Sequence, residues 1–446
     1  MTSGMSGLSG LGLLPMQSAT TDEEKWRRLA EITDRVKSRP GTVTKRHIHA
    51  LGTRLGFGLL PDELTDLPSA QEVSLAGRTV MLDLHFSPEE EVTRVTVQNP
   101  EASTNLQAAT ASAAAVFHDC LAVQPGQSTI TTKLDRFAMN LEKLSKIDKP
   151  HGTAGDRFNG FEAISGIYNS LRKLYDYERE MAMQAFEITD EQEEKAVSEV
   201  TCRKSGRPRM NENGRIGLDL DYWISRRQVR RKAASEPPAA TGRDPNVFSV
   251  SVLCEAMQPG QMTGPARISD TWISDQVVKP APDDVGENTS TSIDWMEPPP
   301  TFVNDATSTE SASNAPLDQV EGKLPSVKFV AKLEPPLLVP GEAATQSGLL
   351  QCSSYHTLPT YINSLLLTKE PLEALSSPVQ MPPGEIVGER NTIAGADGGT
   401  EFHTNTLRMR TFEQAILVHD IAFDHPKQLI ELLPVSNPRR KTSLSH

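Results

Sequence analysis

The chain has 446 residues and a formal net charge of −13, and its composition is 37% hydrophobic and 5% aromatic with 32 prolines. This length allows two or three domains, but the low apolar content predicts that part of the chain lies outside any core. The four cysteines are too widely spaced for a zinc motif or a disulfide framework, and no apolar run approaches the roughly 18 residues of a membrane span. Because the N-terminus also lacks a signal-peptide pattern, we expect a soluble, intracellular protein.

The charge is unevenly distributed along the chain. Residues 201–232 contain ten Lys or Arg and three acidic residues, whereas residues 281–320 contain eight acidic residues and no basic ones. Such asymmetry is typical of proteins with several partners, although a solvated surface is the simpler explanation.

Two helices are predicted at the start of the chain. Residues 22–38 repeat apolar side chains at three- and four-residue steps and therefore form one amphipathic helix. A shorter helix is expected from about Thr44 to Leu55, with Gly56 as its stop. The apolar face of the first helix consists of Trp26, Leu29, Ile32 and Val36.

After these helices the spacing of the apolar residues changes from helical to strand-like. Residues 72–98 alternate and are rich in β-branched side chains, which predicts a hairpin or meander. The alanine-rich stretch 105–121 belongs with these strands and the opening helices in one α+β module, which ends near residue 200.

The sharpest pattern is a pair of amphipathic helices, residues 131–148 and 157–178. Thr132 is the predicted N-cap of the first, and Asn159, with Glu162 three residues on, is that of the second. Their apolar stripes carry no nucleophile or metal ligand, which predicts packing against the core or a partner. The stripes consist of Leu134, Phe137, Leu141, Leu144 and Ile147, and of Phe161, Ile164, Ile167, Tyr168, Leu171, Leu174 and Tyr175.

From about residue 215 to 423, strand-like segments are separated by Pro, Gly and Ser. Residues 281–322 are acidic and expected to be mostly disordered, with Trp295 and Met296 as a candidate docking segment inside them. The predicted fold class is α+β: a helix-rich N-terminal module with a small antiparallel sheet, followed by a β-rich C-terminal region with disordered insertions. The predicted division is a disordered N-terminus (1–20), the α+β module (21–200), a basic patch with a β-rich segment (201–280), the acidic insertion (281–322), a β-rich C-terminal part (323–435) and a disordered basic tail (436–446).

Residues 204–209, KSGRPR, resemble an AT-hook, in which an extended Arg-Gly-Arg-Pro segment binds an A·T minor groove. Ser205 replaces the leading Arg of that motif, so Arg207 and Arg209 are the candidate DNA contacts. A structural or solvated loop is the alternative. A second basic run at 226–232 allows nuclear import or phosphate contact, or is a solvated strand edge.

LIELL at 429–433 matches the LxxLL pattern of leucines that dock a short helix into an apolar groove. Leu429, Leu432 and Leu433 would share one helical face and bind a partner. Burial in the protein's own core is the alternative, because such leucine patterns also occur in core helices. INSLL at 362–366 is a weaker match.

No pattern of catalytic residues emerges. His118, Asp119 and Cys120 are adjacent on a helix and point in different directions, which excludes a triad among them. His47 and His49 have no further ligand nearby in the sequence, and GADGGT lacks the Lys-Ser/Thr of a phosphate-binding loop. We predict no catalytic residue, no cofactor and no metal.

A series of segments along residues 22–435 carries a family resemblance. They are the Trp26 helix, HIHALGTRLGF, the strands VSLAGRTVMLDLHF and VTRVTVQ, both central helices, CRKSGRPRMNENGRIGLDLDYW and HDIAFDHPKQLIELLPV. In this order they resemble the Mediator complex subunit 1 family, in its fungal form.

The resemblance implies a non-enzymatic transcription coactivator component of the middle module of the Mediator complex, which bridges DNA-bound regulators and RNA polymerase II in the nucleus. The implied partners are other middle-module subunits, with activators and RNA polymerase II reached through the complex; direct contact with nucleic acid or membrane is not expected. The resemblance also implies that SGRPR is a fold element and LIELL a poor candidate for receptor binding. The alternative is a direct DNA-binding transcription regulator that uses residues 203–232, and an enzyme of unrecognised type is a weaker one.

Overall fold

The computed structural model describes residues 22–37, 41–59, 72–88, 91–100, 104–123, 132–149, 158–186, 192–224, 247–257, 263–279, 292–303, 323–346, 348–358, 385–387, 391–394, 400–403, 406–408 and 415–435. The helices are α1 (Asp22–Lys37), α2 (Lys45–Arg54), α3 (Thr104–Leu121), α4 (Asp135–Asp148), α5 (Gly160–Ala185), α6 (Gln192–Arg203), α8 (Gly341–Gln346), α9 (Leu349–Cys352) and α11 (Pro426–Val435). The strands are β1 (Gly58–Leu59), β2 (Glu72–Ala76), β3 (Met81–Phe86), β4 (Val92–Gln98), β5 (Arg207–Met210), β6 (Leu218–Ile224), β7 (Val247–Ala256), β8 (Ile273–Val278), β9 (Ile293–Trp295), β10 (Val327–Pro340), β11 (Ser353–Leu358), β12 (Glu385–Val387), β13 (Asn391–Ala394), β14 (Thr400–His403), β15 (Thr406–Arg408) and β16 (Ala415–Phe423). The α+β class predicted from the sequence is confirmed.

The smaller sheet is an antiparallel meander in the order β1-β2-β3-β4. Its alternating side chains place Leu75 opposite Leu82 and Leu84 opposite Val95, and all four are buried. α2 contacts β2, and α3 contacts β4. The meander expected over residues 72–98 is therefore confirmed.

The larger sheet is antiparallel throughout, in the order β11-β16-β10-β7-β6-β5. α5 contacts β5, β6 and β7, and α6 contacts β5 and β6. One core cluster contains side chains of both sheets and extends from Val43 to Leu433. Buried side chains from before and after residue 200 therefore belong to one cluster, and the predicted division of the chain stays a prediction.

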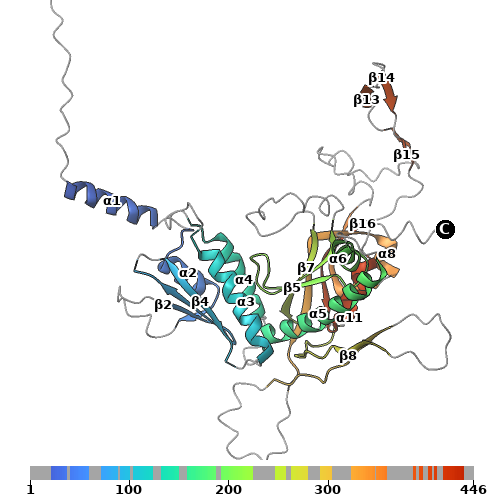
Figure 1. The fold of residues 1–446 in the computed structure, drawn as a ribbon, viewed down its shortest axis with the longest axis horizontal. Coiled ribbons are helices and arrows are strands. Elements are labelled where there is room, and N and C mark those ends of the chain that lie inside the picture. Colours follow the sequence, from blue (N-terminus) through green and yellow to red (C-terminus); the bar gives the residue numbers. More distant parts are fainter. Residues whose placement is uncertain are drawn as a thin grey trace, which may run out of the picture.

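α4 lies between the two sheets (Figure 1). Its predicted stripe is internal, because Phe137, Leu141, Leu144 and Ile147 are each 0% exposed. Burying each of these side chains contributes about 1.5–3 kcal/mol. The stripe therefore packs in the protein's own core and not against a partner.

The ends of α4 are fixed by polar contacts. Asp148 accepts hydrogen bonds from the N–H groups of Thr79 (2.7 Å) and Val80 (3.1 Å) in the turn between β2 and β3. At the other end the predicted N-cap is wrong: Leu134 occupies the cap position without a side-chain bond. Thr132 lies two residues earlier and its carbonyl accepts from Val43 N at 3.2 Å, so strand-like pairing delays the start of the helix.

The N-cap predicted for α5 is confirmed. Asn159 Oδ1 accepts a hydrogen bond from Glu162 N at 3.1 Å, and Asn159 Nδ2 donates to the Glu162 carboxylate at 3.2 Å. The stripe of α5 is buried except for the partly buried Tyr168. At Gly166 a Cβ would lie 2.0 Å from Ser269 O, so only glycine permits this close approach.

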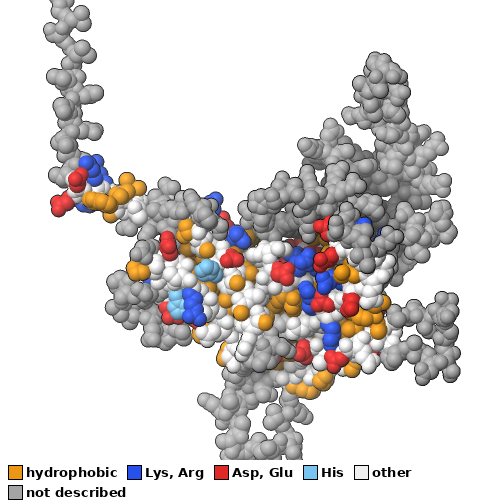
Figure 2. Space-filling model, in the orientation of Figure 1, with side chains coloured by type: hydrophobic (Ala, Val, Ile, Leu, Met, Phe, Trp, Pro, Cys, Tyr) orange, Lys and Arg blue, Asp and Glu red, His pale blue; other side chains and the backbone are white. Residues whose placement is uncertain are grey.

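α1 differs from the other long helices, because its apolar stripe is exposed. Trp26 is 70% exposed, Leu29 53% and Ile32 58%. In Figure 1 the helix stands apart from both sheets, and Figure 2 shows its hydrophobic side chains at the surface. The predicted helix is present, and the part of the protein described here does not cover its apolar face.

Candidate functional site

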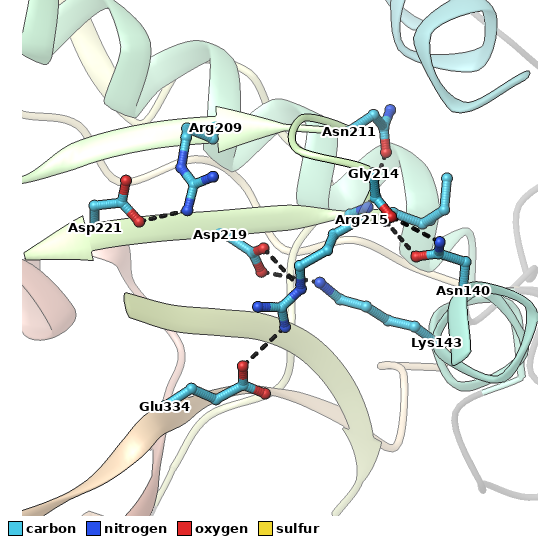
Figure 3. A network of polar contacts seen from close by, with 11 residues as sticks. Asn140, Lys143, Arg209, Asn211, Gly214, Arg215, Asp219, Asp221 and Glu334 are labelled. Carbon is cyan, nitrogen blue, oxygen red and sulfur yellow. Dashed lines mark hydrogen bonds and ion pairs between the residues drawn. The ribbon is translucent and has the colours of Figure 1, made fainter. Parts of the chain in front are cut away.

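The predicted DNA-contact residues lie on β5, at one edge of the larger sheet, and face two aspartates. Arg207 is opposite Asp221 and Arg209 is opposite Asp219 in the antiparallel register. The charges pair diagonally, with Arg209 Nη2 at 2.6 Å from Asp221 Oδ1 (Figure 3). Arg209 is buried at 9% exposure, while Arg207 is half-buried. The Arg209 guanidinium is engaged inside the fold, which speaks against the predicted DNA contact at this residue.

Asp219 is the centre of a second group of charges. Lys143 Nζ on α4 lies 2.9 Å from Asp219 Oδ1, and Arg215 Nε lies 3.4 Å from Asp219 Oδ2. Arg215 Nη2 also lies 2.9 Å from Glu334 Oε2 on β10. These four side chains join α4, β6 and β10, elements that are far apart in the sequence (Figure 3).

Burial and neighbouring charges act differently on the two aspartates. Burial opposes ionisation of Asp219, but the positive charges of Lys143 and Arg215 outweigh it and lower the pKa of the carboxyl. For Asp221 burial dominates and raises the pKa, and Arg209 offsets part of the effect. Burial also lowers the pKa of Lys143, against the attraction of Asp219. Of the two aspartates, Asp219 is therefore the one that the fold favours in its charged form.

Two asparagines fix the loop between β5 and β6. Asn140 on α4 donates through Nδ2 to Gly214 O at 2.8 Å and accepts through Oδ1 from Ile216 N at 2.9 Å (Figure 3). Asn211 has a φ of +53°, a left-handed conformation that Asn tolerates, and donates to Ala109 O on α3 at 2.8 Å. The loop that follows SGRPR is therefore held by α3 and α4.

The start of SGRPR is held by α5. Ser205 donates its N–H and its hydroxyl to Glu178 Oε2, at 3.1 and 2.5 Å. Gly206 has a φ of +85°, and a Cβ there would lie 2.7 Å from Asp221 O. Burial raises the pKa of Glu178, and the Ser205 hydrogen bonds offset part of that effect. Ser205, the residue that departs from the AT-hook pattern, is thus a contact within the fold.

The leucine motif lies on α11, which contacts β16. Leu429 is 0% exposed and Leu433 is 4% exposed, and both belong to the main core, whereas Leu432 is partly buried against it. Two of the three predicted docking leucines are therefore used inside the protein. As folded, α11 does not offer them to a partner.

Of the candidate docking segment, Trp295 packs against the core, whereas the Met296 side chain is 45% exposed. His425 Nδ1 accepts from Lys427 N at 3.0 Å, so Nε2 carries the proton and donates to Met296 O at 2.9 Å. The Trp272 and Trp295 rings meet His425 edge-on at 5.0 and 5.5 Å. Residues 292–303, inside the range expected to be mostly disordered, thus include β9 and cover the start of α11.

The family model of Mediator of RNA polymerase II transcription subunit 1 matches residues 29–435, which include both sheets. The chain belongs to this family. It is a subunit of the Mediator complex that acts in transcription regulation in the nucleus, in association with other Mediator subunits and the transcription machinery. The family is one of non-catalytic scaffold subunits. A search of the curated proteins finds no match to the chain, and the fungal form stays a prediction.

The remaining motifs of this Mediator subunit show no reactive arrangement where they are described. Burial raises the pKa of the Cys120 thiol, and the charge of Arg136 and the hydrogen bond from Asn140 Nδ2 (3.3 Å) offset only part of that effect, so the protonated, unreactive thiol is favoured. No cluster of three or more His, Cys, Asp and Glu suited to a metal occurs among the described residues, and no described helix is long and apolar enough to cross a membrane. Residues 226–232 and 362–366, and all of GADGGT except its last residue, lie outside the described part.

Proposed function

We propose that the chain is a non-enzymatic scaffold subunit of the middle module of Mediator, where it helps to bridge DNA-bound regulators and RNA polymerase II. The family match over residues 29–435 carries this proposal. The use of the polar groups supports it: the Lys143–Asp219 ion pair holds α4 to β6, and the Arg209–Asp221 pair holds β5 to β6. Such groups position elements and perform no chemistry on a substrate.

The direct partners in this proposal are other middle-module subunits. Activators and RNA polymerase II are reached through the complex, and the protein itself needs no contact with nucleic acid or membrane. The burial of Arg209 against Asp221 supports that view. The alternative, direct DNA binding through residues 203–232, has less support because its described part is folded into β5, β6 and their loop.

Affinity purification of the tagged full-length chain from nuclear extract tests the proposal. After a salt wash that separates the modules, we expect middle-module subunits to remain and subunits of other modules to be depleted. If the tagged chain is recovered without any Mediator subunit, the proposal is wrong. Binding of the purified chain to A·T-rich duplex, with the steep salt dependence of phosphate contacts, would favour the DNA-binding alternative.

A further inference from the structure

The exposed stripe of α1 is the apolar face of an amphipathic helix, and no described residue covers it. Trp26, Leu29 and Ile32 are each more than half exposed, whereas the corresponding stripes of α4 and α5 are buried. Leaving three large apolar side chains in water on one helix face forgoes a favourable burial free energy of about 1.5–3 kcal/mol for each. The family match begins at Leu29, within α1, so half of the helix belongs to the matched region.

The charge of α1 excludes nucleic acid and anionic membrane as its natural partner. The helix has five acidic and five basic residues, so its net charge is zero. Some of the basic charge is also neutralised within the helix, because Lys25 lies 3.0 Å from Asp22 and Arg35 lies 2.8 Å from Glu31. Phosphate surfaces are bound by an excess of Lys and Arg, which this helix lacks.

A second copy of the chain is also a poor occupant. Trp26 can bury about 150–250 Å² and the two aliphatic side chains less each, so one face falls short of the about 800 Å² per partner in a standard interface. The helix has 16 residues, whereas coiled coils are recognised over at least about three heptads. A short helix buries enough surface when it lies in a groove that encloses its stripe and both rims, as in helix-in-groove recognition.

One rim of the stripe indicates the charge of that groove. Arg28 and Arg35 lie four residues before and three residues after Ile32, so both border it on the same side of the helix, and both are exposed. Arg27 is on the opposite side of the helix, away from the stripe. Arg35 pairs with Glu31 within the helix, so Arg28 is the charge on this side that an acidic rim beside Ile32 would complement.

We propose that α1 is the docking helix by which this subunit binds a neighbouring Mediator subunit, with Trp26, Leu29 and Ile32 in an apolar groove whose rim beside Ile32 is acidic. The proposal rests on the scaffold function proposed above. It places a partner contact outside the two sheets, on a helix whose loss leaves the core intact.

Affinity purification of the full-length chain from nuclear extract tests the docking helix through two pairs of variants. Trp26→Glu combined with Leu29→Glu should lower the recovery of Mediator subunits by about tenfold or more, the effect of removing buried aromatic anchors. Met139→Glu is the matched control, because Met139 is 53% exposed on α4. Arg28→Glu should lower recovery and Arg27→Glu should not. The thermal unfolding midpoint should stay unchanged in all of these variants, since the replaced side chains are exposed.

A photo-crosslinking amino acid in place of Leu29 identifies the occupant. We expect one dominant adduct, to a single Mediator subunit. Adducts to a second copy of this chain, to the chain itself or to DNA would overturn the proposal, as would full recovery with the α1 double variant. If the unaltered chain recovers no Mediator subunit, the scaffold function and the docking helix both fail. If it recovers them and the double variant does so equally, the docking helix alone fails.

Discussion

Lys143 on α4 and Asp219 on β6 form a buried ion pair, with 2.9 Å between Nζ and Oδ1 and side-chain exposures of 12% and 4%. Asn140, three residues earlier on α4, binds the backbone of the loop before β6. At the end of the same helix, Asp148 binds the β2–β3 turn of the smaller sheet. The central helix therefore carries the polar contacts that join the two sheets, in addition to its apolar stripe.

Replacing Lys143 by Met should destabilise the protein far more than replacing Lys146 by Met. The first change leaves Asp219 buried with Arg215 as its remaining ion-pair partner among the described residues, and breaking a buried pair costs about 3–5 kcal/mol. Lys146 pairs with Glu142 at the surface, where a pair contributes about 0–1 kcal/mol. Urea denaturation measures both free energies of unfolding. Equal, small losses would show that the buried pair does not hold α4 to the larger sheet.

Replacing Glu178 by Gln should alter the pH dependence of stability. Burial raises the pKa of Glu178 above its ordinary value of 4.5. A carboxyl with a raised folded-state pKa contributes stability below its unfolded pKa, and this contribution is lost as the pH rises through the folded pKa. The unaltered protein should therefore lose stability relative to the Gln variant above about pH 4.5.

Unfolding free energies of the two proteins, measured from about pH 4 to about pH 8, test this sign. The amide oxygen of Gln still accepts from Ser205, so the fold is retained. Glu178→Ala lacks that acceptor and should cost about 1–3 kcal/mol. If the unfolding free energies of the unaltered protein and of Glu178→Gln stay parallel across this pH range, the pKa of Glu178 is not raised.

Replacing Arg209 by Met distinguishes a structural arginine from a DNA contact. It leaves Asp221 buried without its 2.6 Å partner and should cost about 3–5 kcal/mol, with a clear fall in the unfolding midpoint. Arg207→Met, at a half-buried position, should cost less. Neither change should alter the binding of the protein to a labelled A·T-rich duplex, measured by fluorescence anisotropy. An unchanged midpoint with weakened duplex binding for Arg209→Met would support the AT-hook interpretation instead.

Truncating the buried leucines of the LIELL motif should lower the stability of the protein. Leu429→Ala and Leu433→Ala each remove a core side chain and should cost about 2–5 kcal/mol. Glu431→Ala, on the exposed side of α11, should change stability by less than about 0.5 kcal/mol. Thermal unfolding of the three variants measures this order. If both leucine variants keep the unaltered midpoint, these side chains are not core residues and a docking role returns.

Local periodicity predicted much of the fold. The stripe of α4, the Asn159 cap of α5 and the meander over residues 72–98 each follow from spacing within a few turns or strands. The N-cap at Thr132 failed because pairing with Val43, distant in the sequence, uses the backbone there. Sequence spacing carries no information about such a contact.

The group of charges around Asp219 was missed for the same reason, since Lys143 and Glu334 come from distant segments. One signal was present: Arg207 and Arg209 alternate before the loop, and Asp219 and Asp221 alternate after it, as expected for facing strands of a hairpin. An Arg-x-Arg spacing fits both an AT-hook and a strand, so it did not separate the two. Likewise, α1 and α4 are both amphipathic helices, and only the tertiary structure shows which apolar stripe is exposed.

The central claim, that this chain works as a scaffold subunit of Mediator, is tested most directly by gradient sedimentation of nuclear extract without any tag. Quantitative mass spectrometry of each fraction follows this chain and the other Mediator subunits together. We predict that the chain sediments with those subunits, far ahead of a monomer of 446 residues, and in a constant ratio to them. A chain that sediments as a monomer, apart from the complex, would contradict the claim.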